Sequence, residues 1–193
     1  MQSIRLCRQK KEDIAHFQSK PAGKLHQHAT YAAMIRSIDQ SIGRVLQTLR
    51  EQQLDQNTII VFTSDNGGYG PATSMLPLRG SKGMLYEGGI RVPLLIKWPG
   101  VTQPGSTTGE AVINVDLYPT FLEMTNIPVL ESELLDGESL VPLLKDPQTR
   151  LESRSLFWHF PAYLQKYQGM QQRFRTTPVS VIRQGDWKLL EFF

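Results

Sequence analysis

An aspartate and an asparagine stand side by side, Asp65-Asn66, after an apolar run at residues 59–62 and before two glycines at residues 67–68. Carboxylate and amide oxygens are the ligands that hard divalent cations such as calcium and magnesium prefer. Alone, an Asn-Gly pair is more often a type I′ hairpin turn, but here the next strand-like run begins only at Val92. The pair is therefore a candidate metal site, with a simple turn as the alternative.

A second group that could do chemistry is the ammonium of Lys82, which lies between Gly80-Ser81 and Gly83. A lysine is a compact point charge that can hold an oxygen of a sulfate or phosphate, and the flanking glycines would let a ligand approach closely. A solvated surface lysine is the alternative. The glycine spacing does not indicate a nucleotide site, because it lacks the Gly-Lys-Ser/Thr order of a phosphate loop and the third glycine of the dinucleotide fingerprint.

The four histidines show no spacing typical of a metal site: His16, His26, His28 and His159. His26 and His28 precede a long helical pattern, where a polar loop explains them as well as a binding site does. His159 lies between two aromatic residues and is expected to pack near the core. We keep His28 and His159 as candidate substrate contacts.

The elements that must position these groups follow from hydrophobic periodicity. Apolar residues at spacings of three and four predict an amphipathic helix over residues 31–49, with Thr30 as its N-cap. Gly43 inside this helix costs about 1 kcal/mol relative to alanine, which indicates close packing there. Residues 58–63 then predict a buried strand, and in open α/β sheets ligands collect at the carboxyl end of such a strand, where Asp65 lies.

Further elements are predicted along the rest of the chain. The core continues with strands at residues 92–98 and 111–114, a helix at 117–124 capped by Asp116, and a short helical piece at 139–144. After about residue 150 we expect a strand at 155–160, a long polar loop at 162–177, and a hairpin of residues 179–183 and 187–190. The chain stops at a Phe-Phe pair inside an apolar run, so we expect a truncated domain.

Composition narrows the function classes. The 193 residues have room for one domain of ordinary size, and the net charge of +3 is spread along the chain, which gives nucleic-acid binding little support. The single cysteine, Cys7, allows no internal disulfide and no multi-cysteine zinc site, and no motif places a histidine or acid beside it. No apolar run approaches the roughly 20 residues that cross a bilayer, and the first residues lack the apolar core of a secretion signal.

Taken together, these segments resemble the carboxyl-side part of the core of a type I sulfatase, of the arylsulfatase kind within the alkaline phosphatase superfamily. The resemblance runs from about residue 28 to residue 193 in fixed order. Its matching segments are residues 31–35 with Asp39 and Gly43, then 57–68, 78–83, 86–93, 98–100, 116–120, 136–137, 156–161 and 183–189. Such an ordered series is a far stronger signal than any one of its parts.

The resemblance implies a fold and a set of site residues. It implies part of an alkaline-phosphatase-like mixed α/β sheet flanked by helices, followed by the start of a smaller antiparallel β region. The expected organisation is an irregular segment at residues 1–27, the α/β core at 28–150, and a truncated C-terminal subdomain at 151–193. In that family the Asp-Asn pair ligates calcium, which here gives Asp65 and Asn66. The lysine contacts sulfate, which here is Lys82, while His28, Arg79 and His159 are candidate substrate contacts.

The nucleophile of that family is a formylglycine, made from a cysteine or serine in a Cys/Ser-x-Pro/Ala-x-Arg motif. No such motif occurs in this sequence, and Cys7 is followed by Arg8-Gln9-Lys10-Lys11. The resemblance therefore implies a hydrolase of small sulfate esters or sulfated glycans, of which this chain supplies the metal ligands and the sulfate contact and is inactive alone. A phosphodiesterase or phosphonate hydrolase of the same superfamily, or a non-catalytic remnant, are the alternatives.

The resemblance also bears on partners and location. We expect no nucleic-acid and no membrane partner, because the charge is spread along the chain and no apolar run is long enough to cross a bilayer, and we predict no oligomeric state. Members of the family are commonly periplasmic, secreted or lysosomal, but this sequence itself assigns no compartment.

Overall fold

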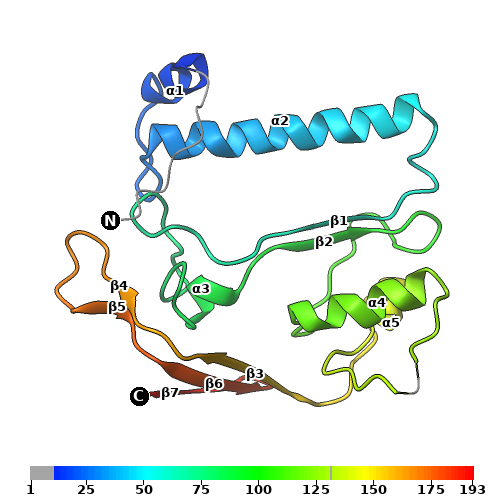
Figure 1. Ribbon diagram of the computed structural model, residues 1–193. Helices are drawn as coiled ribbons and strands as arrows, with labels where there is room; N and C mark the ends of the chain where they lie inside the picture. The colour runs from blue at the N-terminus through cyan, green and yellow to red at the C-terminus, as the bar shows by residue number, and fades with distance from the viewer. Residues whose placement is uncertain (1–10, 131) are drawn as a thin grey trace. The chain divides into compact units, whose positions relative to one another are not determined.

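The computed structural model describes residues 11–130 and 132–193, so Cys7 lies outside the described residues. Two compact units divide the chain, and neither is a continuous stretch. Of the described residues, the first unit contains residues 11–55 together with Ser64–Pro93 and Pro161–Thr177, and the second contains Gln56–Thr63, the described part of Leu94–Phe160 and Pro178–Phe193. Figure 1 labels the helices and strands in chain order. Helices and antiparallel strands are combined, as the predicted mixed α/β class requires.

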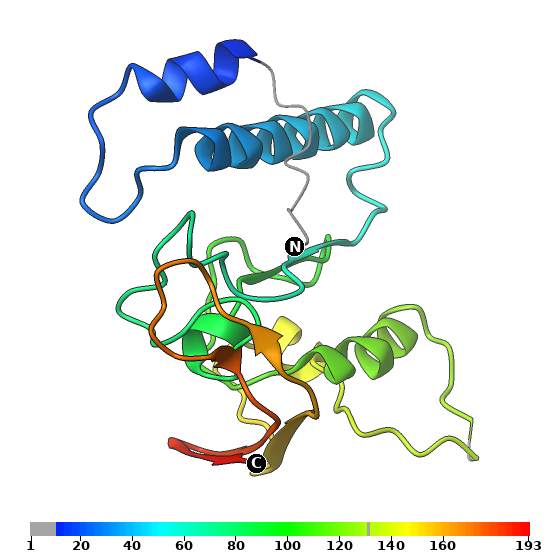
Figure 2. The same cartoon turned by 60° about the vertical axis from the view of Figure 1, so that its left-hand side comes forward.

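Two helices open the first unit. The helix α1 (Lys11–Gln18) packs beside the long helix α2 (Ala29–Glu51), where Asp13 Oδ1 lies 3.4 Å from Arg36 Nε (Figure 2). The expectation of an irregular segment at residues 1–27 is therefore wrong for α1, whose two acidic residues in the first turn favour a helix start. The predicted N-cap at Thr30 is also wrong, because the cap of α2 is His28, whose Nδ1 accepts a hydrogen bond from the amide of Tyr31 at 3.2 Å.

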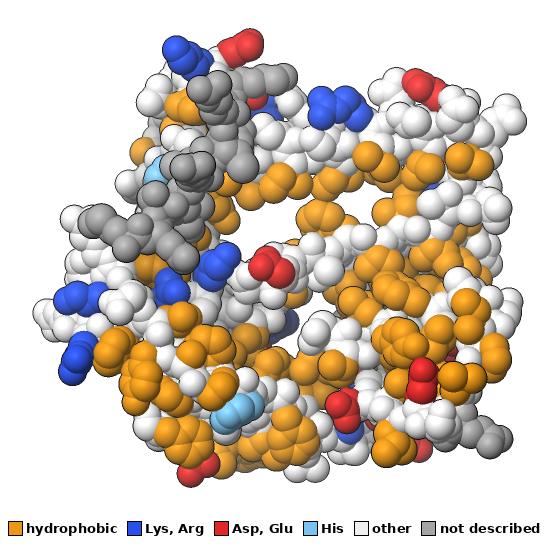
Figure 3. Space-filling view, viewed as in Figure 1, with side chains coloured by type: hydrophobic (Ala, Val, Ile, Leu, Met, Phe, Trp, Pro, Cys, Tyr) orange, Lys and Arg blue, Asp and Glu red, His pale blue; other side chains and the backbone are white. Residues whose placement is uncertain are grey.

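The apolar stripe of α2 was predicted correctly, but it is only partly covered. Ala33 is fully buried, whereas Ile35 and Ile38 are 50% exposed and Val45 is 60% exposed. Hydrophobic side chains form a row along α2 in Figure 3. The close packing expected at Gly43 is wrong for the described part of the chain, since a Cβ placed there would have nothing within 4 Å.

The first unit also holds a short helix and a short hairpin. The helix α3 (Glu87–Ile90) follows a long loop, and β4 (Leu164–Gln165) pairs antiparallel with β5 (Phe174–Thr176). The long polar loop predicted at residues 162–177 is thus wrong in part. The rings of Tyr163 and Phe174, whose centroids are 4.9 Å apart, join the two arms of this hairpin, and such cross-strand aromatic pairs stabilise short strands.

In the second unit, β1 (Ile60–Thr63) pairs antiparallel with β2 (Leu94–Lys97), with Ile60 opposite Lys97. Both strands are shorter than predicted. The expectation that β1 is buried is also wrong within the described chain, because Phe62 is 39% exposed. The carboxyl end of β1 nevertheless leads directly into Asp65, as predicted.

The helical part of the second unit consists of the 3₁₀ turn η1 (Asn114–Asp116), α4 (Leu117–Met124) and α5 (Val141–Lys145). The bounds of α4 are those predicted, but the strand expected at residues 111–114 does not form, and that stretch leads into η1 instead. The side chain of Asp116 does not cap α4. Its carboxylate accepts hydrogen bonds from the amides of Ile113 at 2.8 Å and Glu138 at 3.0 Å.

The C-terminal sheet has the order β3-β6-β7, with β3 (Ser155–Phe160), β6 (Val179–Gln184) and β7 (Trp187–Phe192) all antiparallel. The strand and the hairpin predicted here are confirmed. Gly185 has a φ of 55° at the turn, a conformation that glycine adopts at no steric cost. Within residues 11–130 and 132–193, no helix is both long enough and apolar enough to cross a membrane.

Candidate functional site

Glycines hold three backbone segments of the first unit in direct contact. The amide of Gly67 donates to the carbonyl of Gly89 at 2.8 Å, and the amide of Gly88 donates to the carbonyl of Arg79 at 2.7 Å. A Cβ on Gly67 would lie 1.9 Å from the carbonyl oxygen of Gly88, which is too close for any side-chain atom, so only glycine fits there. The helix α3 is therefore fixed against the loop after β1 on one side and against residues 79–80 on the other, and we call this arrangement the glycine interlock.

The interlock also fixes the backbone of Lys82. Its amide donates a hydrogen bond of 2.9 Å to the carbonyl of Gly68. On the other side, a Cβ on Gly89 would lie 1.8 Å from the carbonyl oxygen of Met84. The metal pair and the lysine predicted from sequence thus lie on adjoining loops of one unit, and their backbones are joined through Gly68.

The side chains of the predicted metal pair lie against each other. The amide nitrogen of Asn66 donates to Oδ2 of Asp65, and the hydroxyl of Ser64 donates to the carbonyl of Asn66 at 2.9 Å. Asp65 is exposed and Asn66 is half-buried. Calcium takes about 6 to 8 oxygens. In the described part of the chain, no group of three or more acidic, histidine or cysteine side chains could hold a metal ion.

Tyrosine and arginine side chains support the Lys82 loop, and the sequence-based prediction did not include them. The hydroxyl of Tyr167 donates to the carbonyl of Lys82 at 2.9 Å, and its ring makes an edge contact with Tyr69 at 5.3 Å between centroids. The guanidinium of Arg175 lies 4.4 Å from the centroid of the Tyr167 ring. Both residues belong to the segment predicted as a loop. The aromatic residues at its two ends, Tyr163 and Phe174, were the signal that could have indicated a hairpin.

The other candidate contacts have structural partners. The guanidinium carbon of Arg79 lies 4.0 Å from the centroid of the Tyr86 ring. His28 caps α2 and also lines a cavity with the loop at residues 70–74. His159 belongs to the second unit, where its Nδ1 lies 2.8 Å from the Ser180 hydroxyl. Because His159 is exposed, the expectation that it packs near the core is wrong.

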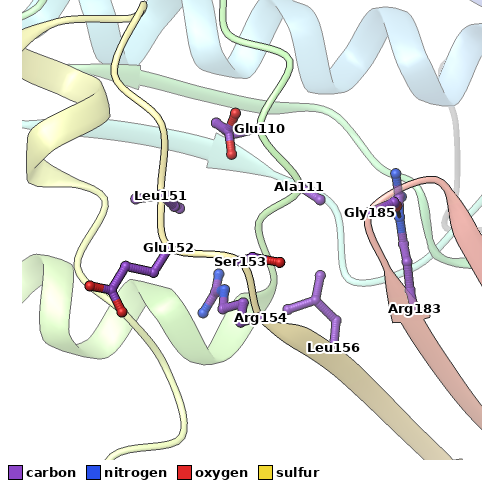
Figure 4. A pocket seen from close by; sticks show the side chains of 9 residues that line it. All are labelled: Glu110, Ala111, Leu151, Glu152, Ser153, Arg154, Leu156, Arg183 and Gly185. Atoms are coloured by element: carbon purple, nitrogen blue, oxygen red, sulfur yellow. Dashed lines mark hydrogen bonds between the residues drawn. The ribbon is translucent and has the colours of Figure 1, made fainter.

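The second unit contains a pocket of about 240 Å³ that none of the predicted site residues line (Figure 4). Two of its charged side chains, Arg154 and Glu110, form ion pairs. Arg154 makes two hydrogen bonds to the fully buried carboxylate of Asp116, at 2.6 and 2.5 Å, and Glu110 accepts one from Arg150 at 2.6 Å.

The pKa of Asp116 reflects this pairing. Burial opposes ionisation of the carboxyl group, but hydrogen bonds from Arg154 and from two backbone amides, with the charge of Arg154, outweigh it. The pKa of Asp116 is therefore held below its ordinary value of 3.8. The hydrogen bonds that Arg154 donates to Asp116, together with the negative charge of that carboxylate, raise the pKa of Arg154. We interpret this pair as a structural element of the second unit.

Two family models match the chain. One is described as Sulfatase and matches residues 6–127, and the other is described as N-sulphoglucosamine sulphohydrolase, C-terminal, and matches residues 81–193. A sulfatase of Formosa agariphila is 41% identical over 151 residues, which covers 72% of this chain and 27% of that protein. Human steryl-sulfatase is 35% identical over 159 residues, with 78% and 27% covered.

Solved structures agree with these matches. The structure of Ps i-CgsB in complex with k-i-k-neocarrahexaose is similar with a TM-score of 0.77 at 31% identity, covering 97% of this chain and 38% of that one. A phosphonate monoester hydrolase from Silicibacter pomeroyi is also similar, with a TM-score of 0.63 at 25% identity and coverages of 85% and 32%. The chain spans about a quarter of the length of the curated relatives it matches.

Proposed function

The chain belongs to the sulfatase family, the type I enzymes of the alkaline phosphatase superfamily, and from this premise we propose that it forms the metal-binding and sulfate-binding part of a sulfate-ester hydrolase. The observation that best supports the proposal is the hydrogen bond between the Lys82 amide and the Gly68 carbonyl. It joins the loop of Asp65 and Asn66, whose side chains would supply two oxygen ligands, to a loop with an exposed cation. Such an arrangement suits a small, doubly charged oxyanion.

In this proposal each residue has a separate task. Asp65 and Asn66 would supply two oxygen ligands to calcium, and a bound cation would neutralise charge on the sulfate oxygens. The ammonium of Lys82 would bind a further sulfate oxygen. Because charge on these oxygens must be stabilised as the ester bond breaks, a fixed cation lowers the barrier by several kcal/mol in comparable sites.

The nucleophile is not part of the proposed role of these 193 residues. The Cys/Ser-x-Pro/Ala-x-Arg motif that would yield a formylglycine is absent from the sequence. We therefore propose that the isolated chain binds sulfate and calcium but does not turn over a sulfate ester. Incubation of the purified chain with 4-nitrophenyl sulfate and calcium should release no nitrophenol, and steady release would contradict this part of the proposal.

Phosphonate monoester hydrolysis is the second candidate function, because a hydrolase of that class has a similar structure. The two functions predict different anion preferences. The ¹⁵N-labelled chain should show amide shift changes around Lys82 at lower concentrations of sulfate than of methylphosphonate. Amide shifts at lower concentrations of methylphosphonate than of sulfate would favour phosphonate monoester hydrolysis.

The decisive variant is Lys82→Ala, titrated with sodium sulfate and followed by the amide shifts of the loops that carry Asp65 and residue 82. The sulfate-dependent shifts should be lost. Lys145→Ala, which removes an exposed lysine from the last turn of α5, is the matched control and should respond as the unmodified chain does. Unchanged sulfate binding by Lys82→Ala would remove the proposed role of this lysine.

A further inference from the structure

We propose that the cavity between the start of α2 and the loop at residues 70–74 is a subsite for the alcohol part of the sulfate ester, and that it takes a neutral, hydroxyl-rich ring such as a sugar residue. We call it the α2 cavity. This inference rests on the proposed function, because it assigns the part of the substrate that lies beside the sulfate. Its test is designed so that the two proposals can fail separately.

The α2 cavity has the volume of a small-molecule site and a lining of polar side chains. Its volume is about 450 Å³, within the range of about 300 to 1,000 Å³ that is usual for ligand pockets. Its hydrogen-bonding side chains are those of Gln27 and His28 on one wall and of Thr73 and Ser74 on the other. Among residues 11–130 and 132–193, no aspartate, glutamate, lysine or arginine lines the cavity, so this lining suits a neutral group.

A hydrogen bond ties the two walls together. The Nδ1 atom of His26 lies 3.0 Å from the hydroxyl of Thr73, across 47 residues of sequence. The loop wall is itself a compact turn, because the amides of Ala72 and Thr73 both donate to the carbonyl of Tyr69, at 2.9 and 3.1 Å. The cavity is therefore formed before a ligand arrives, which lowers the entropic cost of binding.

The lining side chains can both donate and accept. Since Nδ1 of His28 accepts from the Tyr31 amide, the ring hydrogen resides on Nε2, which can donate. The Ser74 oxygen accepts from the amide of Leu76 at 3.2 Å, and its hydroxyl hydrogen can still be donated. Sugar hydroxyls also donate and accept, so they match this wall. A sterol or an aryl ring would instead remove water from these groups without replacing its hydrogen bonds.

The α2 cavity adjoins the Lys82 loop at two points. A Cβ on Gly68, whose carbonyl binds the Lys82 amide, would lie 2.6 Å from Cγ2 of Thr73. A Cβ on Gly70, which lines the cavity, would lie 2.9 Å from the hydroxyl of Ser81. The wall of the cavity thus lies against Ser81, which precedes Lys82, and against Gly68, whose carbonyl accepts a hydrogen bond from the Lys82 amide. A ring held in the cavity would therefore lie beside the loop that carries Lys82.

The test uses the ¹⁵N-labelled full chain and four probes: inorganic sulfate, N-acetylglucosamine, N-acetylglucosamine 6-sulfate and phenyl sulfate. Inorganic sulfate should shift amides of the Lys82 loop, and N-acetylglucosamine should shift amides at residues 25–28 and 70–74. The sugar sulfate should shift both sets and bind more tightly than phenyl sulfate. Gln27→Ala should weaken the sugar sulfate at least about fivefold without changing inorganic sulfate.

Two further variants make the test specific. Ser74→Ala should reproduce the effect of Gln27→Ala, and Gln40→Ala, which changes an exposed glutamine on α2 away from the cavity lining, should have none. Sugar probes that leave residues 25–28 and 70–74 unshifted, or tighter binding of phenyl sulfate, would overturn the subsite while the sulfate site could stand. A response to N-acetylglucosamine without any response to sulfate would support the subsite and remove the proposed function.

Discussion

The hydroxyl of Tyr167 donates a hydrogen bond of 2.9 Å to the carbonyl oxygen of Lys82, a residue 85 positions earlier in the chain. The Tyr167 ring is held in turn between Tyr69 and the guanidinium of Arg175. A Cβ on Gly83 would lie 2.6 Å from Leu164, so the β4–β5 hairpin packs directly on this loop. Tyr167 is therefore a positioning residue for the lysine that we propose as the sulfate contact.

Tyr167→Phe should loosen the Lys82 loop while the ring contacts remain. Loss of one neutral hydrogen bond costs about 1 kcal/mol, which corresponds to about fivefold faster amide exchange for openings that break this bond. The measurement is hydrogen exchange at the amides of Lys82 and Gly88, together with the sulfate titration, in which we expect weaker binding. Tyr163→Phe is the control, because Tyr163 is 57% exposed and keeps its ring contact with Phe174. Equal exchange rates in the two variants would contradict the positioning role.

The space around Gly67, in the glycine interlock, and around Gly43, in α2, predicts opposite effects for the two glycine-to-alanine changes. Gly67→Ala places a methyl group 1.9 Å from a backbone carbonyl that cannot move aside, so we expect a loss of about 3 kcal/mol or more of local stability. Gly43→Ala meets nothing within 4 Å in the middle of α2 and should stabilise that helix by about 0.5 to 1 kcal/mol. Hydrogen exchange of the Gly67 and Gly88 loops and of α2 measures both, and tolerance of Gly67→Ala would disprove the interlock.

Elements with a local signal were predictable from the sequence, and those that depend on distant partners were not. The helix at residues 117–124 and the strand at 155–160 were predicted with their observed bounds, because their periodicity and turn residues are contained within them. The capping role given to Asp116 failed because its strongest partner, Arg154, is 38 residues away. The β4–β5 hairpin was missed because strands of two and three residues carry almost no alternating pattern.

The candidate site shows the same distinction between residues with a local sequence signal and contacts that depend on distant partners. Asp65, Asn66 and Lys82 could be proposed from residue types and their order, and the structure places their loops together through Gly68. No local pattern indicated that Tyr167 contacts the Lys82 loop or that His26 bonds to Thr73. Both contacts close long loops, and sequence spacing alone does not predict which side chains meet across such loops.

Two ion pairs of the second unit, one buried and one exposed, predict different losses of unfolding free energy when their arginines are replaced. Arg154→Met leaves the fully buried carboxylate of Asp116 without its cation, which costs about 3 to 5 kcal/mol in comparable pairs. Arg150→Met removes a pair whose arginine side chain is 81% exposed, which is worth about 0 to 1 kcal/mol. All three tryptophans, Trp98, Trp158 and Trp187, belong to the second unit, so urea unfolding followed by tryptophan fluorescence reports on it. Similar losses of unfolding free energy in the two variants would contradict the prediction.

Calcium binding by the chain should be weak and should depend on Asp65. Two side-chain ligands of the about 6 to 8 that calcium takes predict a dissociation constant in the millimolar range or weaker. Amide shifts of the Asp65 loop during a calcium titration measure it, and Asp65→Ala should abolish the response. Asp55→Ala is the control, because Asp55 lies in the first unit outside the predicted site. Micromolar binding that survives Asp65→Ala would place the ion elsewhere.

The lowered pKa of Asp116 predicts acid sensitivity of the second unit. A carboxyl group whose pKa is lower in the folded than in the unfolded state contributes stability that is complete above the unfolded value. That contribution is lost as the pH falls below about 4 toward the folded-state pKa. Urea midpoints from tryptophan fluorescence should therefore fall between pH 5 and about pH 3, and Asp116→Asn should be less stable at neutral pH but lose less stability over this range. An equally steep fall in Asp116→Asn would show that other carboxylates cause the acid sensitivity.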